Sequence, residues 1–157
     1  AAPHNPQDQV ISSRALQLAW DALGEAEHIS SAWVLQTCGY SDTTEAMRRV
    51  YSGQAPPYLT DQAITWLLQR DPLHLLVDIP SIDREEDAGI LPNHHRFWEL
   101  PLGQRTLQGP PSSRTITEMI CVPTQIPEGL YGLEIQIPAF LQDAAPSRPR
   151  LYPLSRS

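Results

Sequence analysis

The chain has 157 residues, 41% of them apolar, which suits one globular domain with its own core and excludes the disordered and fibrous classes. A net charge of −7 and scattered arginines exclude nucleic acid as the expected partner, because binding there depends on neutralising phosphates. No apolar run approaches the roughly 20 residues that span a bilayer, and residues 1–6 lack the features of a signal peptide. We therefore expect a single domain over 1–157, located in the cytoplasm and without a membrane partner.

The chain is expected to begin with a helix and a strand. Apolar residues recur at helical spacing over 11–23, where Ser12 or Ser13 provides a cap and Gly24 a stop. The run SAWVLQTC at 31–38 is short, mostly apolar and contains Val and Trp. These features predict a strand that is buried on both faces.

A second helix and a second strand follow. The stretch 39–59 is rich in Gly, Pro and Ser, and a loop of that length is expected to cover something. Thr60 is expected to cap a helix that Pro72 ends, and the run LHLLVDI at 73–79 is expected to form a buried strand. Because strand, helix and strand follow in this order, we predict two adjacent parallel strands joined by a right-handed crossover.

The rest of the chain is less regular. A polar loop over 80–91 precedes a short predicted helix over 94–98. Two segments, 115–122 and 130–137, alternate with period two and are expected to form an edge or antiparallel part of the sheet. The proline-rich tail from Pro138 is expected to be loop. The predicted fold class is therefore α/β, with a mixed sheet that contains a parallel βαβ unit.

The two cysteines, Cys38 and Cys121, lie far apart in apolar surroundings. We expect them to be buried, reduced core residues in a reducing compartment. An alternative is a cysteine hydrolase in which Cys38, at the end of a strand, is the nucleophile and a histidine is its base.

Glu118 is the most informative residue, because it shares the apolar face of its segment with Ile116 and Ile120. A carboxylate on such a face is costly unless a cation, an arginine or hydrogen bonds hold it. A metal ion would hold it. The alternatives are an exposed edge strand, or an ion pair with Arg96 or Arg114.

The adjacent pair His94 and His95 is the second candidate. On a helix, neighbouring side chains point in different directions, so at most one of them serves a given site. Imidazole and carboxylate together suit zinc or manganese, although a catalytic site usually has three protein ligands. A surface or helix-capping pair is the alternative.

An acidic loop, DIPSIDREED over 78–87, leaves the carboxyl end of the second predicted strand. Open α/β sheets bind their ligands at this end. Asp78 or Asp83 is therefore a candidate base or supporting residue. The alternative is turn and cap chemistry with a solvated charge run.

Together these segments resemble the cyclase family of metal-dependent hydrolases, which includes bacterial kynurenine formamidase and isatin hydrolase. The most specific piece is DIPSID at 78–83, which is similar to that family's (V/I)D-x-P-S-(I/V)-D stretch. The other matching pieces, in chain order, are YSG at 51–53, PPYLT at 56–60, NHHRFW at 93–98, TITE at 115–118 and DAAPSRP at 143–149.

The resemblance implies a swivelling β/β/α-type domain in which His94 and Glu118 are ligands of a divalent metal, Zn or Mn. The implied reaction is hydrolysis of an amide or formamide C–N bond in a small-molecule substrate by metal-activated water. Residues expected to support the site or contact substrate are Asp78, Ser81, Asp83 and His95.

The family's His-x-Gly-Thr-His-x-Asp motif does not occur in this sequence. We therefore expect the C-terminal portion of a longer protein, with a domain that is incomplete at its N-terminus and a homo-oligomer, most simply a dimer. One hypothesis is a hydrolase part that, alone, binds metal weakly and hydrolyses nothing. The other is a non-catalytic remnant that serves oligomerisation or ligand binding. The first requires that His94 and Glu118 lie side by side.

Overall fold

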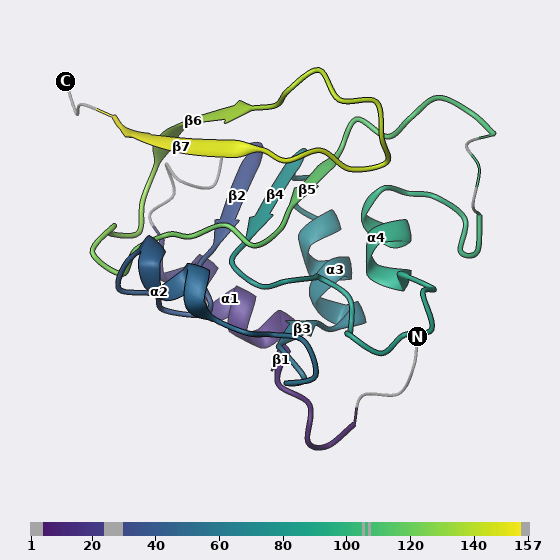
Figure 1. Cartoon of the computed structure of the whole chain (residues 1–157), viewed down its shortest axis with the longest axis horizontal. Coiled ribbons are helices and arrows are strands. Elements are labelled where there is room, and N and C mark those ends of the chain that lie inside the picture. The colour runs from purple at the N-terminus through teal and green to yellow at the C-terminus, as the bar shows by residue number, and fades with distance from the viewer. Residues whose placement is uncertain (1–4, 24–29, 105, 107, 155–157) are drawn as a thin grey trace.

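The computed structural model describes residues 5–23, 30–104, 106 and 108–154. Helices and strands alternate along the chain as far as β5, and the described residues form an α/β fold with parallel and antiparallel sheets. Figure 1 shows the three-stranded sheet β2-β4-β5, with helices α1, α3 and α4 on one side of it and the hairpin β6–β7 on the other. No helix among the described residues is long and apolar enough to cross a membrane.

The predicted first helix is present but starts later than expected. Helix α1 spans Ser13–Ala22, and the Ser12 hydroxyl accepts a hydrogen bond from the Ala15 amide. Ile11, which was expected to begin the helix, instead lies in strand β1 (Val10–Ile11), which pairs in parallel with β3 (Tyr58–Leu59). Gly24, the expected stop, lies outside the described residues.

The predicted parallel pair is confirmed. Strand β2 (Ala32–Leu35) pairs in parallel with β4 (His74–Val77), and the chain between them contains α3 (Asp61–Leu68). The Thr60 hydroxyl accepts from the Ala63 amide, as the predicted cap requires. The expectation that both strands are fully buried was wrong for β2, whose residues are half-buried because β2 is an edge strand, whereas β4 is central.

The predicted long loop 39–59 contains a short helix. Helix α2 spans Thr43–Arg48, and the Asp42 carboxylate accepts from the Glu45 amide. The Glu45 carboxylate in turn accepts from the amide and the hydroxyl of Ser41. These reciprocal hydrogen bonds stabilise one exposed turn of helix without an apolar stripe.

The segment 115–122 was predicted to form an edge or antiparallel part of the sheet, and strand β5 (Thr115–Thr117) is not antiparallel, because it pairs in parallel with β4. It is an edge strand, as expected. The predicted alternation to residue 122 does not persist, since the strand ends at Thr117 and Met119 has φ +56°. The connection from β4 to β5 includes α4 (Pro92–Phe97) and is long enough for a parallel crossover.

The tail contains a strand that the sequence did not predict. Strand β6 (Tyr131–Gln136) pairs with β7 (Arg148–Pro153) in an antiparallel hairpin. The expected mixed sheet that includes 130–137 was therefore wrong, because β6 lies in a separate two-stranded sheet and the three described strands of the central sheet are all parallel. Pro149 and Pro153 make the sequence of β7 look like that of a loop, because proline is unusual in strands. In a two-stranded sheet each strand has one free edge, where a missing amide hydrogen is tolerated.

The core lies between the sheet and the helices. Ile64 and Leu67 of α3 and Leu75 and Val77 of β4 have exposed fractions of 0%. Helix α3 contacts α1 on one side and α4 on the other. This packing holds α4 against the carboxyl-terminal end of the sheet, where the candidate site lies.

Candidate functional site

His94 and Glu118 are in direct contact. His94 lies on α4, Glu118 follows β5, and the distance from His94 Nε2 to Glu118 Oε1 is 3.2 Å. The Ile82 amide also donates to Glu118 Oε1 at 2.9 Å. The structure therefore brings together the two residues that the resemblance assigned to a metal.

The two arginines considered as partners of Glu118 contact other groups. Arg114 forms ion pairs with Asp71 and Glu99, and Arg96 donates to the Thr65 hydroxyl and to the Asp61 carbonyl oxygen. Neither contacts Glu118. The half-buried carboxylate of Glu118 is held by an imidazole and a backbone amide instead.

Asp83 holds the other side of the His94 ring. Its Oδ2 lies 2.7 Å from His94 Nδ1 and also accepts from the His94 amide at 3.1 Å, while its Oδ1 accepts from the Asn93 amide at 2.7 Å. The cap position of α4, Leu91, has no side-chain oxygen, so Asp83, from earlier in the same loop, satisfies the first free amides of this helix. One carboxylate thus fixes both the start of α4 and the orientation of the imidazole.

Asn93 is a site residue that sequence reasoning missed. Its side-chain amide donates to the carbonyl oxygens of Leu59 and Ile82 at 2.7 and 2.8 Å, and the residue is buried. It thereby ties β3, the acidic loop and α4 together. No sequence pattern distinguishes it from an ordinary polar residue in the first turn of a helix.

The contacts of His94 determine its charge. Burial by itself lowers the pKa of His94, but the hydrogen bonds and charges of Asp83 and Glu118 outweigh it and raise the pKa from 6.5 to about 9. At neutral pH the ring is an imidazolium that donates from both nitrogens. Trp98 lies edge-on to this ring, with centroids 5.1 Å apart.

A strained residue follows Glu118. Met119 has φ +56°, a left-handed conformation that is unusual for a residue with a side chain. The Met119 amide donates to the Ile79 carbonyl oxygen. The next amide, that of Ile120, donates to the Val77 carbonyl oxygen. The regular pairing of β5 ends at Thr117, so Glu118 lies between the last paired residue and this kink.

Asp78 contacts other residues than His94. Its carboxylate accepts from the Thr37 amide, the Thr37 hydroxyl and the Cys38 amide, and the residue is 1% exposed. Three donors satisfy the charge. Asp78 therefore joins the ends of β2 and β4 and is not part of the His94 contacts.

Of the remaining predicted residues, some support the His94 contacts and others lie elsewhere. The Ser81 hydroxyl accepts from the Asp83 amide at 3.1 Å and supports the loop that carries Asp83. His95 Nδ1 lies 2.8 Å from the Pro101 carbonyl oxygen, so this ring is turned to another loop. Asp87 accepts from the Gly89 and Leu91 amides, which is the turn chemistry considered for this segment.

Both cysteines are free, and both are half-buried rather than fully buried as expected. Cys38 Sγ lies 3.4 Å from the Asp78 carbonyl oxygen and 3.8 Å from the Tyr51 hydroxyl. Among the described residues these contacts include no histidine, so this part of the chain offers no base for the cysteine-hydrolase alternative. Burial raises the pKa of the Cys121 thiol, which disfavours the thiolate.

The described residues contain no group of three or more His, Cys, Asp or Glu side chains that could hold a metal ion. The described part of the site therefore offers one imidazole nitrogen and one carboxylate as ligands. No protein-family model, curated protein or solved structure matches the chain.

Proposed function

We propose that this chain is part of a metal-dependent hydrolase of the cyclase family, in which His94 and Glu118 are two ligands of a divalent ion, Zn or Mn. The observation that carries the proposal is the 3.2 Å contact between His94 Nε2 and Glu118 Oε1, with Asp83 on the opposite ring nitrogen. The proposed fold is the family's swivelling β/β/α domain, and the proposed protein is a cytoplasmic homo-oligomer.

The distances support the ligand pair. Two ligand atoms that each lie about 2.1 Å from a tetrahedral metal are about 3.4 Å apart. The observed separation of 3.2 Å is close to this value. The remaining ligands would come from groups outside the described residues.

Asp83 supports the same interpretation. Metal-binding histidines usually donate their second ring N–H to a carboxylate, which fixes the ring and makes it more basic. Asp83 Oδ2, 2.7 Å from His94 Nδ1, is such a carboxylate and is itself held by two backbone amides. A buried, immobilised acceptor of this kind orients Nε2 toward Glu118.

The proposed substrate is a small-molecule amide or formamide. A bound metal supplies polarisation of the carbonyl and a water of lowered pKa. The chain's own residues have simpler tasks. His94 and Glu118 hold the ion, Asp83 keeps the proton on His94 Nδ1, and Asn93 keeps α4 in register with the acidic loop.

A non-catalytic domain is the second candidate, and one observation favours it. His94 as an imidazolium already satisfies both carboxylates, since Nδ1 faces Asp83 and Nε2 faces Glu118. Such a closed set of charges stabilises a fold without any metal. Oligomerisation or ligand binding would then be the function.

Metal titration of the purified chain tests the proposal. We expect weak binding of Co²⁺ and Zn²⁺, followed by visible absorption and calorimetry, that falls at least tenfold in both His94→Asn and Glu118→Gln. The matched controls are His95→Asn on the same helix and Glu86→Gln in the exposed part of the acidic loop. Equal binding in all four variants would refute the ligand assignment.

An assay with an N-formyl aromatic amide separates the two parts of the proposal. We expect no turnover by this chain alone, because a His–Glu pair lacks the third protein ligand of catalytic zinc sites. Turnover that a chelator and Glu118→Gln both abolish would support the metal but contradict the claim that this part is insufficient.

A further inference from the structure

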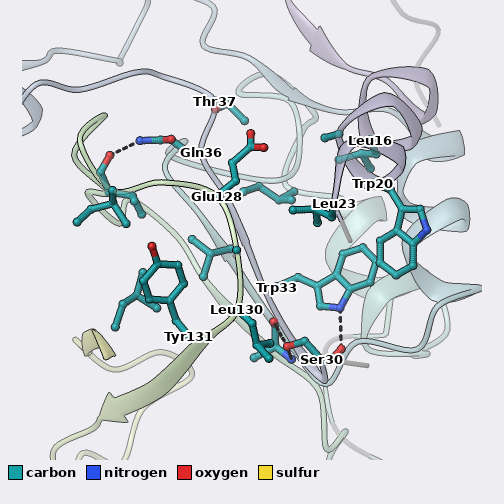
Figure 2. Close-up of a pocket in the computed structure, with 18 of the residues that line it drawn as sticks. Leu16, Trp20, Leu23, Ser30, Trp33, Gln36, Thr37, Glu128, Leu130 and Tyr131 are labelled. Carbon is teal, nitrogen blue, oxygen red and sulfur yellow. Dashed lines mark hydrogen bonds between the residues drawn. The ribbon is translucent and has the colours of Figure 1, made fainter. Parts of the chain in front are cut away.

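A pocket of about 360 Å³ lies at the β2 edge of the three-stranded sheet. Glu118 follows β5, which forms the opposite edge of that sheet. Its walls are α1, the edge strand β2 and the 126–131 segment that leads into β6. Figure 2 shows Leu16, Trp20 and Leu23 of the α1 region on one side, with Glu128 and Leu130 across from them. None of the residues that line it belongs to the His94, Asp83 and Glu118 contacts.

The pocket presents mainly apolar surface. Trp33 stacks on Trp20 with centroids 4.7 Å apart, and its indole N–H is already donated to the Ser30 carbonyl oxygen. The Thr37 hydroxyl donates to Asp78, and the Tyr131 hydroxyl donates to Pro127. A ligand therefore meets aromatic and aliphatic walls whose hydrogen-bond donors are largely engaged within the protein.

Glu128 is the exception. Among the described residues that line the pocket it alone carries a charge, and its carboxylate makes no hydrogen bond or ion pair to the described part of the chain. The chain as a whole has a net charge of −7, which adds to the negative potential at the pocket. Both the local and the overall charge favour a cation.

The aromatic wall favours a ligand that carries an aromatic ring. Trp33 lines the pocket, and aromatic rings pack favourably against one another by offset stacking or edge to face. The Arg70 guanidinium already lies over the Trp66 and Trp20 rings, so the charge of a ligand belongs at Glu128 and not on these ring faces. A volume of about 360 Å³ falls in the range of small-molecule sites. We propose that this pocket binds a small aromatic amine, with its ring against Trp33 and its ammonium group at Glu128.

The test uses three probes that share one ring system and differ in charge. They are 2-(2-naphthyl)ethylamine, 2-(2-naphthyl)ethanol and 3-(2-naphthyl)propionate, titrated into the chain by calorimetry. We expect the amine to bind about threefold to fivefold more tightly than the alcohol, as for an exposed charge pair, and the carboxylate to bind most weakly. The indole N–H signal of Trp33 in a ¹H–¹⁵N spectrum should shift with the amine.

Two variants locate the site. In Glu128→Gln the amine should bind no better than the alcohol, whose affinity stays unchanged. Ala19→Phe should abolish binding of all three probes, because Ala19 is an exposed alanine of α1 that lines the pocket. Leu18→Phe is the control, since Leu18 lies on α1, is 63% exposed and does not line the pocket. Circular dichroism verifies that each variant folds.

Several results would overturn the proposal. Equal affinity for amine and carboxylate would remove the charge argument, and full binding to Ala19→Phe would move the site elsewhere. Absence of binding by all three probes would leave the pocket without this ligand class. A dimer that Ala19→Phe dissociates would assign the pocket to a second copy of the chain.

Discussion

At the scale of single residues, Asp83 has the largest structural influence in the candidate site. Its two oxygens accept from two backbone amides and from the ring of His94, and the residue is 2% exposed. A neutral amide in its place would direct N–H groups at some of these donors. Because the position is buried and the described residues offer these two amides no other acceptor, the unsatisfied N–H groups would lower the stability of the fold.

We expect Asp83→Asn to lower the free energy of unfolding by roughly 2 to 4 kcal/mol, from lost charge-assisted hydrogen bonds at a buried position. Metal affinity should fall by a further 10-fold to 100-fold on the proposal above. Urea unfolding and zinc calorimetry measure the two effects. Asp143→Asn, on the exposed loop between β6 and β7, is the control. An unchanged unfolding midpoint would contradict the contacts assigned to Asp83.

His94 gives the chain a specific dependence of stability on pH. Because its pKa rises from 6.5 to about 9 on folding, the protonated ring stabilises the fold by roughly 3 kcal/mol below pH 6.5. This contribution is lost as the pH rises through 9. Urea unfolding in the presence of EDTA should therefore show stability that declines between pH 6.5 and 9.

The matching variants isolate this effect. His94→Gln should abolish the decline, whereas His95→Gln should retain it, because His95 contacts the Pro101 carbonyl oxygen rather than a carboxylate. A wild-type profile that is flat over this pH range would show that Asp83 and Glu118 do not hold the proton on His94.

At the scale of elements, the end of β5 is determined by Met119. The left-handed conformation at φ +56° costs energy for any residue with a Cβ, and the side chain recovers little by burial because it is 64% exposed. The kink separates Thr117, which still pairs with Leu76, from Ile120, whose amide returns to β4 at Val77. Glu118 lies between Thr117 and this kink and faces His94 for that reason.

We expect Met119→Gly to leave stability unchanged or to raise it by up to about 1 kcal/mol, since glycine adopts this conformation without strain. The same exchange at Met47, in helix α2 and 85% exposed, should instead cost about 1 kcal/mol. Thermal or urea unfolding of the two variants measures the contrast. A clear loss of stability in Met119→Gly would show that the side chain contributes more than its exposure indicates.

The elements that could be predicted are those with long or chemically explicit signals. Helix α3 has a capping Thr60, an apolar stripe and a terminating Pro72, and it forms where expected. Strand β5 has only three regular residues, and its direction depends on a crossover that local periodicity does not encode. Strand β7 carries prolines at two of its six positions, which a local pattern reads as loop.

In the candidate site, too, some features could be predicted from the sequence and others could not. The contact of His94 with Glu118 followed from the resemblance, because nothing local links a helix to the end of a distant strand. Asn93 and the double role of Asp83 depend on how the acidic loop folds over the start of α4. Such loop geometry is set by tertiary contacts, so the sequence left Asp83 as one of several carboxylates.

At the scale of the whole molecule, the two faces of the sheet are covered differently. Helices α1, α3 and α4 pack tightly on one face, where core residues of α3 and β4 are fully buried (Figure 1). On the other face a pocket of about 210 Å³ remains between Leu76 of β4 and Leu133 and Leu151 of the hairpin. The hairpin β6–β7 is therefore the less firmly packed layer.

Exposed apolar side chains follow the first strand of this hairpin. Ile137, Phe140 and Leu141 are 62%, 54% and 97% exposed. Apolar residues that gather in one exposed segment are typical of surfaces that another protein covers. The sequence led us to expect a homo-oligomer, and we propose that this segment forms the contact between two copies of the chain.

We expect a dimer at micromolar concentration that Leu141→Asp converts to a monomer, because burying a charge in an apolar contact without a partner costs more than such a contact supplies. Multi-angle light scattering measures the mass directly. Met47→Asp is the matched control, since Met47 is 85% exposed on α2 and lies outside the hairpin. A monomeric wild-type chain at 100 μM would contradict the prediction. A dimer that survives Leu141→Asp would instead move the contact away from the hairpin.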